Sequence, residues 1–366
     1  MNNKTPVSHM KGDPAHIEKR SAGLGFAIIL ATTVILLVAV IISLCIVIMT
    51  ADGDDEPYIP AGNIDGDDDV IQTTVTTSNQ NKLYPTIPSR TSYVIGKSEN
   101  VIRIDSSSVT SGYSILVELS SYNSVAEKNA DSKIYPASMT KVMTLVVACE
   151  RITDFTEKLT VTQDISDFMA QQGGSGVGLK VGDSYTVEDL LYLVSYQSDT
   201  TATLLLAQRV AGSEDAFVAL MNQKVSELGL TSTHFANATG LHSEDNYTTC
   251  REMASIMAYA MDNELAYQLM TSYQGRPYTV GGVNCIFYSS WYSSRFKDNS
   301  RLSKGTILGG KTGYVDESGY TLVSFAEING KKYINVTVTR TDKNGIKLQE
   351  KAAGEEVKYI YNNYAK

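Results

Sequence analysis

Cysteine, tryptophan and histidine are scarce in this chain, and basic residues are outnumbered by acidic ones. The 366 residues include four cysteines, one tryptophan and four histidines, and the net charge is −9. The cysteines are scattered and form no CxxC pair, so we predict no disulfide framework, no metal site and no cofactor. We interpret all four cysteines as buried thiols: Cys45, Cys149, Cys250 and Cys285. Because no basic surplus is available to displace counterions from phosphates, we expect no nucleic-acid partner.

Charged residues are absent from one long stretch, residues 24–49, which is rich in Ile, Leu, Val and Ala. As a helix this stretch would extend about 39 Å, enough to cross a bilayer with some tilt. It is longer than the apolar region of a cleaved signal peptide, which favours an uncleaved anchor. Basic residues precede it and acidic residues follow it. We therefore predict a cytoplasmic tail over 1–23, a transmembrane helix over 24–49 and an extracellular remainder in a single-pass cell-membrane protein.

The extracellular remainder is predicted to contain a linker and one domain. Residues 50–99 are rich in Asp, Gly, Thr and Ser without a sustained apolar period, which is typical of a flexible linker. Over 100–366 the apolar spacing predicts regular structure. We expect strands over 101–104 and 113–119, helices over 138–151, 187–211, 213–229, 249–261 and 346–364, and a hairpin of 320–327 with 332–340. These elements predict an α/β fold of the α+β sandwich type, with an antiparallel sheet flanked by helices and a helical lobe.

A serine and a lysine stand one helical turn apart at the start of the first predicted helix. Ser138 follows Pro136-Ala137, and Lys141 lies three residues later on the same face. A neutral amine beside a hydroxyl can accept its proton, and burial or a second cation would lower the lysine pKa enough for this. Taken alone, the pair is more often a helix cap and a surface lysine.

Two further motifs lie later in the chain, first Ser195-Tyr196-Gln197 and then Lys311-Thr312-Gly313. Lys311-Thr312-Gly313 precedes a predicted strand, and its cation and hydroxyl suit a carboxylate, while its glycine lets a substrate backbone approach. Ser195-Tyr196-Gln197 interrupts the 187–211 pattern and would present a hydroxyl and an amide from a short loop. Each motif alone is more often a turn or a helix kink. The ordered trio predicts a serine acyl-transfer site.

The three motifs together resemble the serine-lysine site of penicillin-recognising enzymes. Residues from about 101 to 340 look like the D-alanyl-D-alanine carboxypeptidase family, the low-molecular-mass penicillin-binding proteins. The supporting stretches are 135–141, Met221-Asn222 with Leu228-Gly229-Leu230, 233–242, 310–314 and Gly319-Tyr320. The resemblance implies a β-lactamase/transpeptidase-like fold. It also implies peptidoglycan stem peptides ending in D-Ala-D-Ala as substrates and β-lactam antibiotics as covalent inhibitors.

The resemblance assigns each motif a role. Ser138 would be acylated, with Lys141 as the general base and Ser195 as the proton relay to the leaving amine. Gln197 would bind the substrate amide, and Lys311 and Thr312 would hold the terminal carboxylate. Gly313 would admit the substrate, and the N–H groups of Ser138 and Tyr314 would form the oxyanion hole.

The second motif differs from the family pattern at one residue, and this difference leaves alternative functions open. The family's second motif is usually Ser-x-Asn, and Gln197 occupies the place of the asparagine. The preferred interpretation is a membrane-anchored serine carboxypeptidase that trims D-Ala outside the cytoplasmic membrane. The alternatives are a weakly active or non-catalytic protein that binds the cell wall, and a β-lactamase, which would need rapid deacylation.

Overall fold

The computed structural model describes residues 91–340 and 349–366. These belong to one compact unit, Asn79–Lys366. The predicted tail over 1–23, the transmembrane helix over 24–49 and most of the linker lie outside the described residues. Within 91–340 and 349–366, no helix has the length and apolar character that a membrane span requires.

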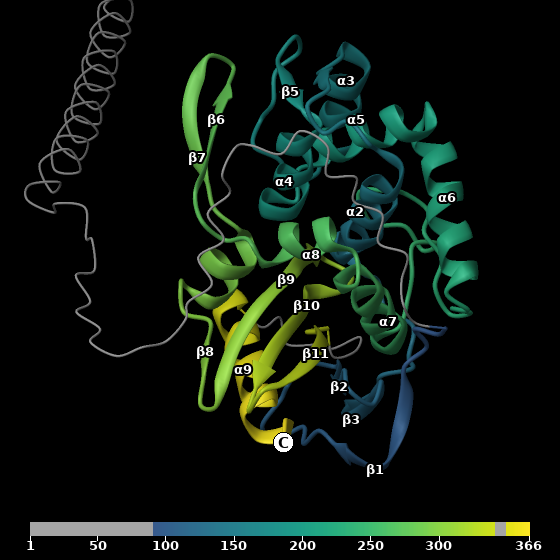
Figure 1. The fold of residues 1–366 in the computed structure, drawn as a ribbon, viewed down its shortest axis with the longest axis vertical. Helices are drawn as coiled ribbons and strands as arrows, with labels where there is room; N and C mark the ends of the chain where they lie inside the picture. Colours follow the sequence, from purple (N-terminus) through teal and green to yellow (C-terminus); the bar gives the residue numbers. More distant parts are fainter. Residues whose placement is uncertain (1–90, 341–348) are drawn as a thin grey trace, which may run out of the picture. The chain divides into compact units, whose positions relative to one another are not determined.

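A seven-stranded sheet organises the domain, in the order β1-β3-β2-β11-β10-β9-β8 (Figure 1). Neighbouring strands are antiparallel except for the parallel pair of β1 with β3. The strands are β1 Gly96–Arg103, β2 Tyr113–Glu118, β3 Asn123–Lys128, β8 Arg301–Leu302, β9 Gly305–Val315, β10 Gly319–Ile328 and β11 Lys331–Val338. The predicted antiparallel sheet is thus confirmed except at its β1 edge.

Strands β10 and β11 are joined by a two-residue turn. Ile328 pairs with Lys331, and the turn residues Asn329 and Gly330 have φ of 52° and 74°. Positive φ at both central positions gives the turn a twist that matches the flanking strands, and asparagine and glycine adopt it at low cost. The predicted hairpin is confirmed.

Helices cover one face of the sheet and form a lobe beside it (Figure 1). They are η1 Ala137–Met139, α2 Thr140–Arg151, α3 Gln163–Gln172, α4 Val187–Gln197, α5 Thr200–Ala211, α6 Glu214–Glu227, α7 Cys250–Met261 and α8 Glu264–Thr271. Five of these helices have an N-cap residue whose side chain accepts a hydrogen bond from the backbone N–H three residues later, which has no partner within the helix. These caps are Thr186, Asp199, Ser213, Thr249 and Asn263.

The opposite face of the sheet carries α9 Glu350–Tyr364 and the short turn η2 Trp291–Arg295. Strand β10 shows the alternation that makes two cores: Val323 and Phe325 join the core of the helical lobe, and Leu322 and Ala326 join the core under α9. Two small two-stranded antiparallel sheets complete the domain. They are β4 Lys158–Thr160 with β5 Ser184–Thr186, and β6 Arg276–Val280 with β7 Val283–Phe287.

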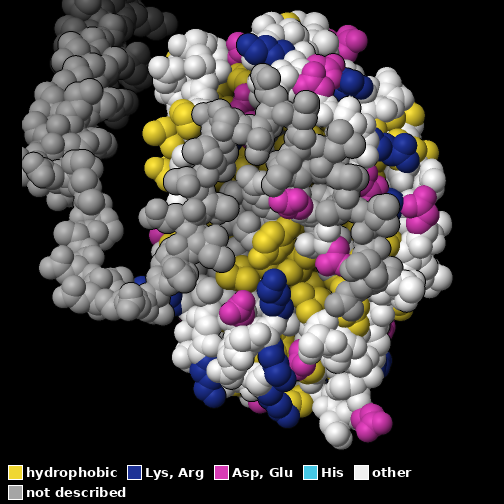
Figure 2. All heavy atoms as spheres, in the orientation of Figure 1, with side chains coloured by type: hydrophobic (Ala, Val, Ile, Leu, Met, Phe, Trp, Pro, Cys, Tyr) yellow, Lys and Arg dark blue, Asp and Glu magenta, His cyan; other side chains and the backbone are white. Residues whose placement is uncertain are grey.

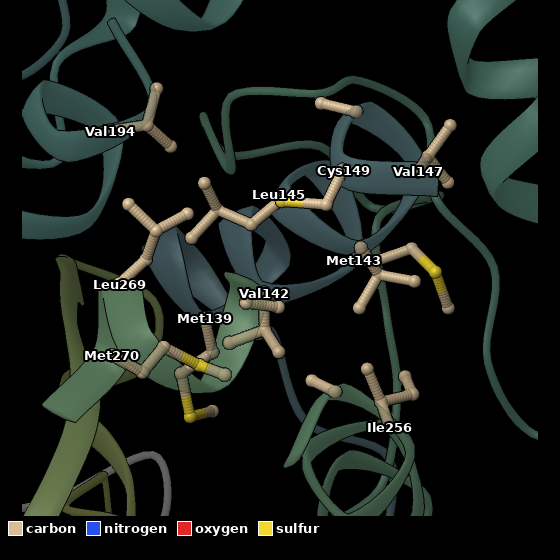
Figure 3. Close-up of a cluster of buried hydrophobic side chains, with 14 of the residues drawn as sticks. Met139, Val142, Met143, Leu145, Val147, Cys149, Val194, Ile256, Leu269 and Met270 are labelled. Atoms are coloured by element: carbon tan, nitrogen blue, oxygen red, sulfur yellow. The ribbon is translucent and has the colours of Figure 1, made fainter. Parts of the chain in front are cut away.

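The core of the lobe surrounds α2. Figure 3 shows Val142 and Leu145 of α2 among Val194 of α4 and Leu269 and Met270 of α8, and all five are fully buried. Burying each such side chain contributes about 1.5–3 kcal/mol. This packing fixes the start of α2, and hence the predicted nucleophile, against the rest of the domain.

Several boundaries differ from the prediction. Tyr93 and Ile95 are buried, so the folded domain begins before residue 100 and includes part of the predicted linker. The helical stretch over 187–211 is broken after Gln197 and not near Ser195. Cys149 and Cys250 are buried thiols as expected, whereas Cys285 is only partly buried; Cys45 lies outside the described residues.

Figure 2 shows positive and negative side chains mixed on the described surface of one face. Lys and Arg side chains are interspersed with Asp and Glu over its described surface. That surface offers no basic stripe of the kind that follows a phosphate backbone. The expectation of no nucleic-acid partner stays a prediction.

Candidate active site

Ser138 is the partly exposed residue of a turn that is otherwise buried. It lies in the middle of η1, the turn that immediately precedes α2, and its neighbours Ala137 and Met139 are buried. Ala137 has φ of 50°, a left-handed conformation that costs a residue with a Cβ about 1–2 kcal/mol. The turn is held in place from the sheet, because Thr321 Oγ1 donates a hydrogen bond to the Pro136 carbonyl at 3.2 Å.

Two glycines let other segments close around this turn. A Cβ on Gly313 of β9 would lie 2.7 Å from the Ser138 nitrogen, and a Cβ on Gly240 would lie 2.2 Å from the Ala137 carbonyl oxygen. Neither position has room for a side chain. The glycine of the Lys311-Thr312-Gly313 motif therefore brings β9 directly against the backbone of Ser138.

Lys141 is buried behind Ser138. Its Nζ lies 3.4 Å from Ser138 Oγ and donates to the Thr239 carbonyl, and the side chain is 1% exposed. Burial lowers the pKa of Lys141 to about 7, against the opposing effect of the carboxylates of Asp199 and Glu214. A large fraction of the amine is then neutral near pH 7, as a general base requires.

Lys311 lies on β9 and is equally buried. Its Nζ donates to Ser198 Oγ and to the Thr312 carbonyl, each at 3.0 Å. Burial lowers its pKa well below the usual value, and the nearby cations of Lys141 and Arg295 lower it further. Across the described residues Lys311 forms no ion pair with a carboxylate, so an incoming substrate carboxylate would supply the missing charge.

The structure corrects the second motif. Ser195 and Gln197 lie in the last turn of α4 and not in a loop. Ser195 Oγ donates to the Leu269 carbonyl at 2.8 Å in the core, and Gln197 Nε2 donates to the Tyr288 carbonyl at 2.7 Å. Neither side chain is hydrogen-bonded to Ser138, Lys141 or Lys311.

Ser198 occupies the place that we had assigned to Ser195. It ends α4 with φ of 57° and ψ of 32°, and this left-handed conformation leaves Ser198 Oγ within reach of Lys311 Nζ. The second motif is therefore Ser198-Asp199-Thr200, with threonine where the usual pattern has asparagine. A signal was present in the sequence, because Asp199 is a strong helix cap and marks the break in the helical pattern.

Asp199 joins this motif to the glycine-rich stretch 173–178. Its carboxylate accepts from Ala202 N and Val177 N, both at 2.8 Å, and Thr200 N donates to the Ser175 carbonyl at 2.8 Å. The stretch therefore lies beside the second motif and shapes that side of the site.

The remaining predicted residues lie along β9. Thr312 Oγ1 is 2.9 Å from Ser290 Oγ, and Tyr314 is 46% exposed with its ring against Tyr320 at 4.8 Å between centroids. Strand β8 pairs with β9 only at Gly305 and Thr306. In the described sheet, the outer edge of β9 beside the motif has no strand next to it, so an extended peptide could align there.

Arg295 is a further site residue that the motifs did not indicate. It is 3% exposed and donates to the Thr321 carbonyl at 3.4 Å, and its Nε lies 3.7 Å from Glu350 Oε1, an ion-pair distance without a hydrogen bond. Burial lowers its pKa to about 10. Thr321 pairs with Gly313, so this cation lies behind the motif on β9. No group of three or more His, Cys, Asp or Glu side chains suited to a metal ion occurs in the described part of the chain.

Comparison with known proteins gives one consistent family. The family model described as D-alanyl-D-alanine carboxypeptidase matches residues 99–341. D-alanyl-D-alanine carboxypeptidase DacF of Bacillus subtilis is 32% identical over 226 residues, which cover 61% of this chain and 55% of the relative. DacA of Escherichia coli is 34% identical over 221 residues, covering 58% and 52%. The chain thus spans about half the length of these curated relatives.

Solved structures with the same fold include a DD-transpeptidase and a D-alanyl-D-alanine carboxypeptidase. A mutant of a Streptomyces DD-transpeptidase aligns with a TM-score of 0.61 and 23% identity, covering 69% of this chain and 97% of that one. A D-alanyl-D-alanine carboxypeptidase from Mycobacterium tuberculosis aligns with a TM-score of 0.59 and 23% identity, covering 74% and 97%. At this identity the similarity establishes the fold alone, and it confirms the transpeptidase-like fold that the family resemblance implied; the predicted transmembrane helix lies outside the described residues.

Proposed function

Because the chain belongs to the D-alanyl-D-alanine carboxypeptidase family, we propose that it is a serine-type D-Ala-D-Ala carboxypeptidase that works through an acyl-enzyme on Ser138. One observation carries the proposal: the Ser138 hydroxyl lies 3.4 Å from a buried amine whose pKa is about 7. This pair lies against the Lys311-Thr312-Gly313 segment of β9. The substrate would be a peptidoglycan stem peptide ending in D-Ala-D-Ala.

The first half of the reaction forms the acyl-enzyme. Ser138 Oγ attacks the carbonyl carbon of the penultimate D-Ala while Lys141 Nζ takes the hydroxyl proton. The developing oxyanion is stabilised by the N–H groups of Ser138 and Tyr314, and a donor of this kind is worth about 3–4 kcal/mol in other enzymes. The peptide C–N bond then breaks, and the amine of the terminal D-Ala receives a proton through Ser198 Oγ, in the role first assigned to Ser195.

The second half regenerates the enzyme. A water molecule attacks the ester carbonyl, Lys141 accepts a proton from that water, and Ser138 leaves as its hydroxyl. Throughout, Lys311 and Thr312 hold the terminal carboxylate of the substrate, whose peptide lies along the free edge of β9. A β-lactam carries both a strained amide and a carboxylate, so penicillin would acylate the same serine.

The location of the enzyme is part of the proposal. The uncharged stretch 24–49, with basic residues before it and acidic residues after it, supports a membrane anchor with the catalytic domain outside the cell. Protease digestion of intact cells would test it, because an extracellular domain is cleaved and an intracellular one is protected.

The test of the mechanism is labelling by a fluorescent penicillin, together with D-Ala release from a synthetic pentapeptide. Ser138→Ala should abolish both, because no other group can form the ester. Ser132→Ala, at an exposed serine of the same segment, is the matched control and should behave as wild type. A folded wild-type protein that takes up no label, or a Ser138→Ala variant that still takes it up, excludes the mechanism.

The lifetime of the acyl-enzyme separates the alternatives. A β-lactamase would hydrolyse the penicilloyl ester rapidly, whereas a carboxypeptidase would retain the label. The other alternative is a wall-binding protein with little activity. Thr200 favours it, because threonine has no side-chain amide to bind the substrate where the usual motif has asparagine. That protein would bind muropeptides without releasing D-Ala.

A further inference from the structure

We propose that Glu214 is a positioning residue that acts on the reaction through Lys141: it holds the backbone that receives the Lys141 amine and keeps a negative charge near that amine. This inference rests on the proposed role of Lys141 as the base. None of the three sequence motifs includes Glu214, which lies in the helical lobe.

Glu214 is anchored at the start of a helix. It is the first residue of α6, directly after the cap Ser213, whose hydroxyl accepts from Ala216 N at 3.1 Å. Its carboxylate turns away from the helix, and Oε1 accepts a hydrogen bond from Ala238 N at 2.9 Å. The carboxylate therefore ties α6 to the segment 237–240.

The same segment binds Lys141 on its other side. The Ala238 carbonyl accepts from Thr144 Oγ1 at 2.7 Å, and the next carbonyl, that of Thr239, accepts from Lys141 Nζ. Thr144 and Lys141 are both on α2. Because the N–H that Glu214 binds and the carbonyl that Lys141 binds belong to adjacent residues, the position of the carboxylate fixes the acceptor of the amine.

The segment then continues to the nucleophile. Gly240 has φ of 77°, and its N–H donates to Asn237 Oδ1 at 2.7 Å. Its α-carbon lies so close to the Ala137 carbonyl that no Cβ fits. A displacement of 237–240 would therefore move both the acceptor of Lys141 and the turn that carries Ser138.

Three charged groups face the Lys141 amine from different elements. Asp199 approaches from the α4–α5 connection and Glu214 from α6, and both favour the ammonium form; Lys311 on β9 is a neighbouring cation. Both carboxylate oxygens of Asp199 are used by backbone N–H groups. Glu214 itself faces Lys141 and its exposed neighbour Asp215, and burial together with Asp215 raises its pKa.

The sign of the effect follows from these charges. A negative Glu214 stabilises the protonated amine, so it raises the pKa of Lys141 from the lower value that burial alone would produce. Removing the charge should lower that pKa and leave more neutral amine below pH 7. Acylation of the variant should therefore be faster than that of wild type below pH 7. A variant that merely folded poorly would be acylated more slowly.

The experiment is the pH profile of penicillin acylation in the full-length protein carrying Glu214→Gln. The glutamine oxygen can still accept from Ala238 N, so the charge is removed and the contact kept. We expect the acid limb to move down by about one pH unit, with labelling about fivefold faster at about pH 6 and within about twofold of wild type at about pH 9. Asp215→Asn removes an exposed charge from the same helix end and should leave the limb in place.

Other results overturn the proposal. They are an unchanged acid limb, an equal shift in Asp215→Asn, or a loss of rate that is uniform across pH. The pKa of Lys141 can also be followed without activity, by NMR titration of 13C-lysine-labelled full-length protein, with Lys141→Arg assigning the signal. A midpoint in Glu214→Gln equal to that of wild type refutes the inference, even if wild type takes up no penicillin and the proposed function fails separately.

Discussion

Ser195 and Ser198 are three positions apart, but one hydroxyl is in the core and the other is in the candidate site. Ser195 is in a regular helical turn, so its hydroxyl faces the lobe and bonds the Leu269 carbonyl. Ser198 takes the left-handed conformation that ends α4, and its hydroxyl meets Lys311. The difference in backbone conformation, and not in side-chain chemistry, makes one a core residue and the other a site residue.

Matched substitutions should separate these roles. Ser198→Ala should slow both acylation and D-Ala release by about 100-fold or more, because the proton relay is lost. Ser195→Ala should keep the acylation rate and lower the free energy of unfolding by about 1–2 kcal/mol, because the Leu269 carbonyl loses its partner. Acylation kinetics and urea denaturation of both variants provide the comparison. A slower rate in Ser195→Ala than in Ser198→Ala would restore the original assignment.

Helix α9 closes the face of the sheet that is remote from the lobe. Its Val357 and Ile360 are fully buried in the core shared with the sheet. Its Glu356 is also buried, and the carboxylate accepts hydrogen bonds from the backbone N–H and the hydroxyl of both Thr110 and Ser111. The carboxylate thus joins the last helix to the segment that leads into β2.

Replacing Glu356 by glutamine should weaken this attachment without affecting catalysis. Both carboxylate oxygens of Glu356 accept hydrogen bonds from Thr110 and Ser111. In glutamine an NH2 group replaces one of these oxygens, so two donors would face each other and at least one hydrogen bond would be lost. We expect a loss of about 1–3 kcal/mol in the free energy of unfolding, measured by urea denaturation, with penicillin acylation unchanged. Glu355→Gln, at the exposed neighbouring position, is the control and should be neutral. Equal stability of the two variants would contradict the role of Glu356.

The domain keeps three buried cations close together although the chain as a whole is acidic. Lys141, Lys311 and Arg295 are each 3% exposed or less, and the pKa of each is lowered by burial. Lys141 is balanced by Asp199 and Glu214, whereas Lys311 has only neutral hydrogen-bond acceptors. Such an arrangement costs stability and suits an anionic ligand.

Lys311→Met should therefore stabilise the fold while it abolishes activity. We expect a gain of about 1–3 kcal/mol near neutral pH, measured by denaturation. Because burial lowers the pKa of Lys311 in the folded state, wild-type stability falls as the pH drops below the unfolded value of 10.5, and the gain from Lys311→Met shrinks as the pH rises toward that value. Lys351→Met, at an exposed position of α9, should be neutral. A destabilised Lys311→Met variant would show that the buried cation supports the fold.

Local patterns were sufficient for most of the elements and for two of the three motifs. The spacing of Ser138 and Lys141, the glycine of Lys311-Thr312-Gly313 and the Asn329-Gly330 turn depend on residues close in sequence. Their chemistry can be recognised there, because helix periodicity and turn conformation act over a few residues.

The tertiary structure decided which groups meet. The contact of Ser198 with Lys311 joins residues 113 positions apart, and that of Lys141 with Thr239 joins residues 98 apart. These contacts depend on the left-handed end of α4, on strand register and on packing of the lobe against β9. No local pattern specifies these contacts, because they form only when distant segments share one core. The Asp199 cap indicates where α4 ends, but only the fold brings the Ser198 hydroxyl to Lys311 and places Glu214 beside the segment that Lys141 binds.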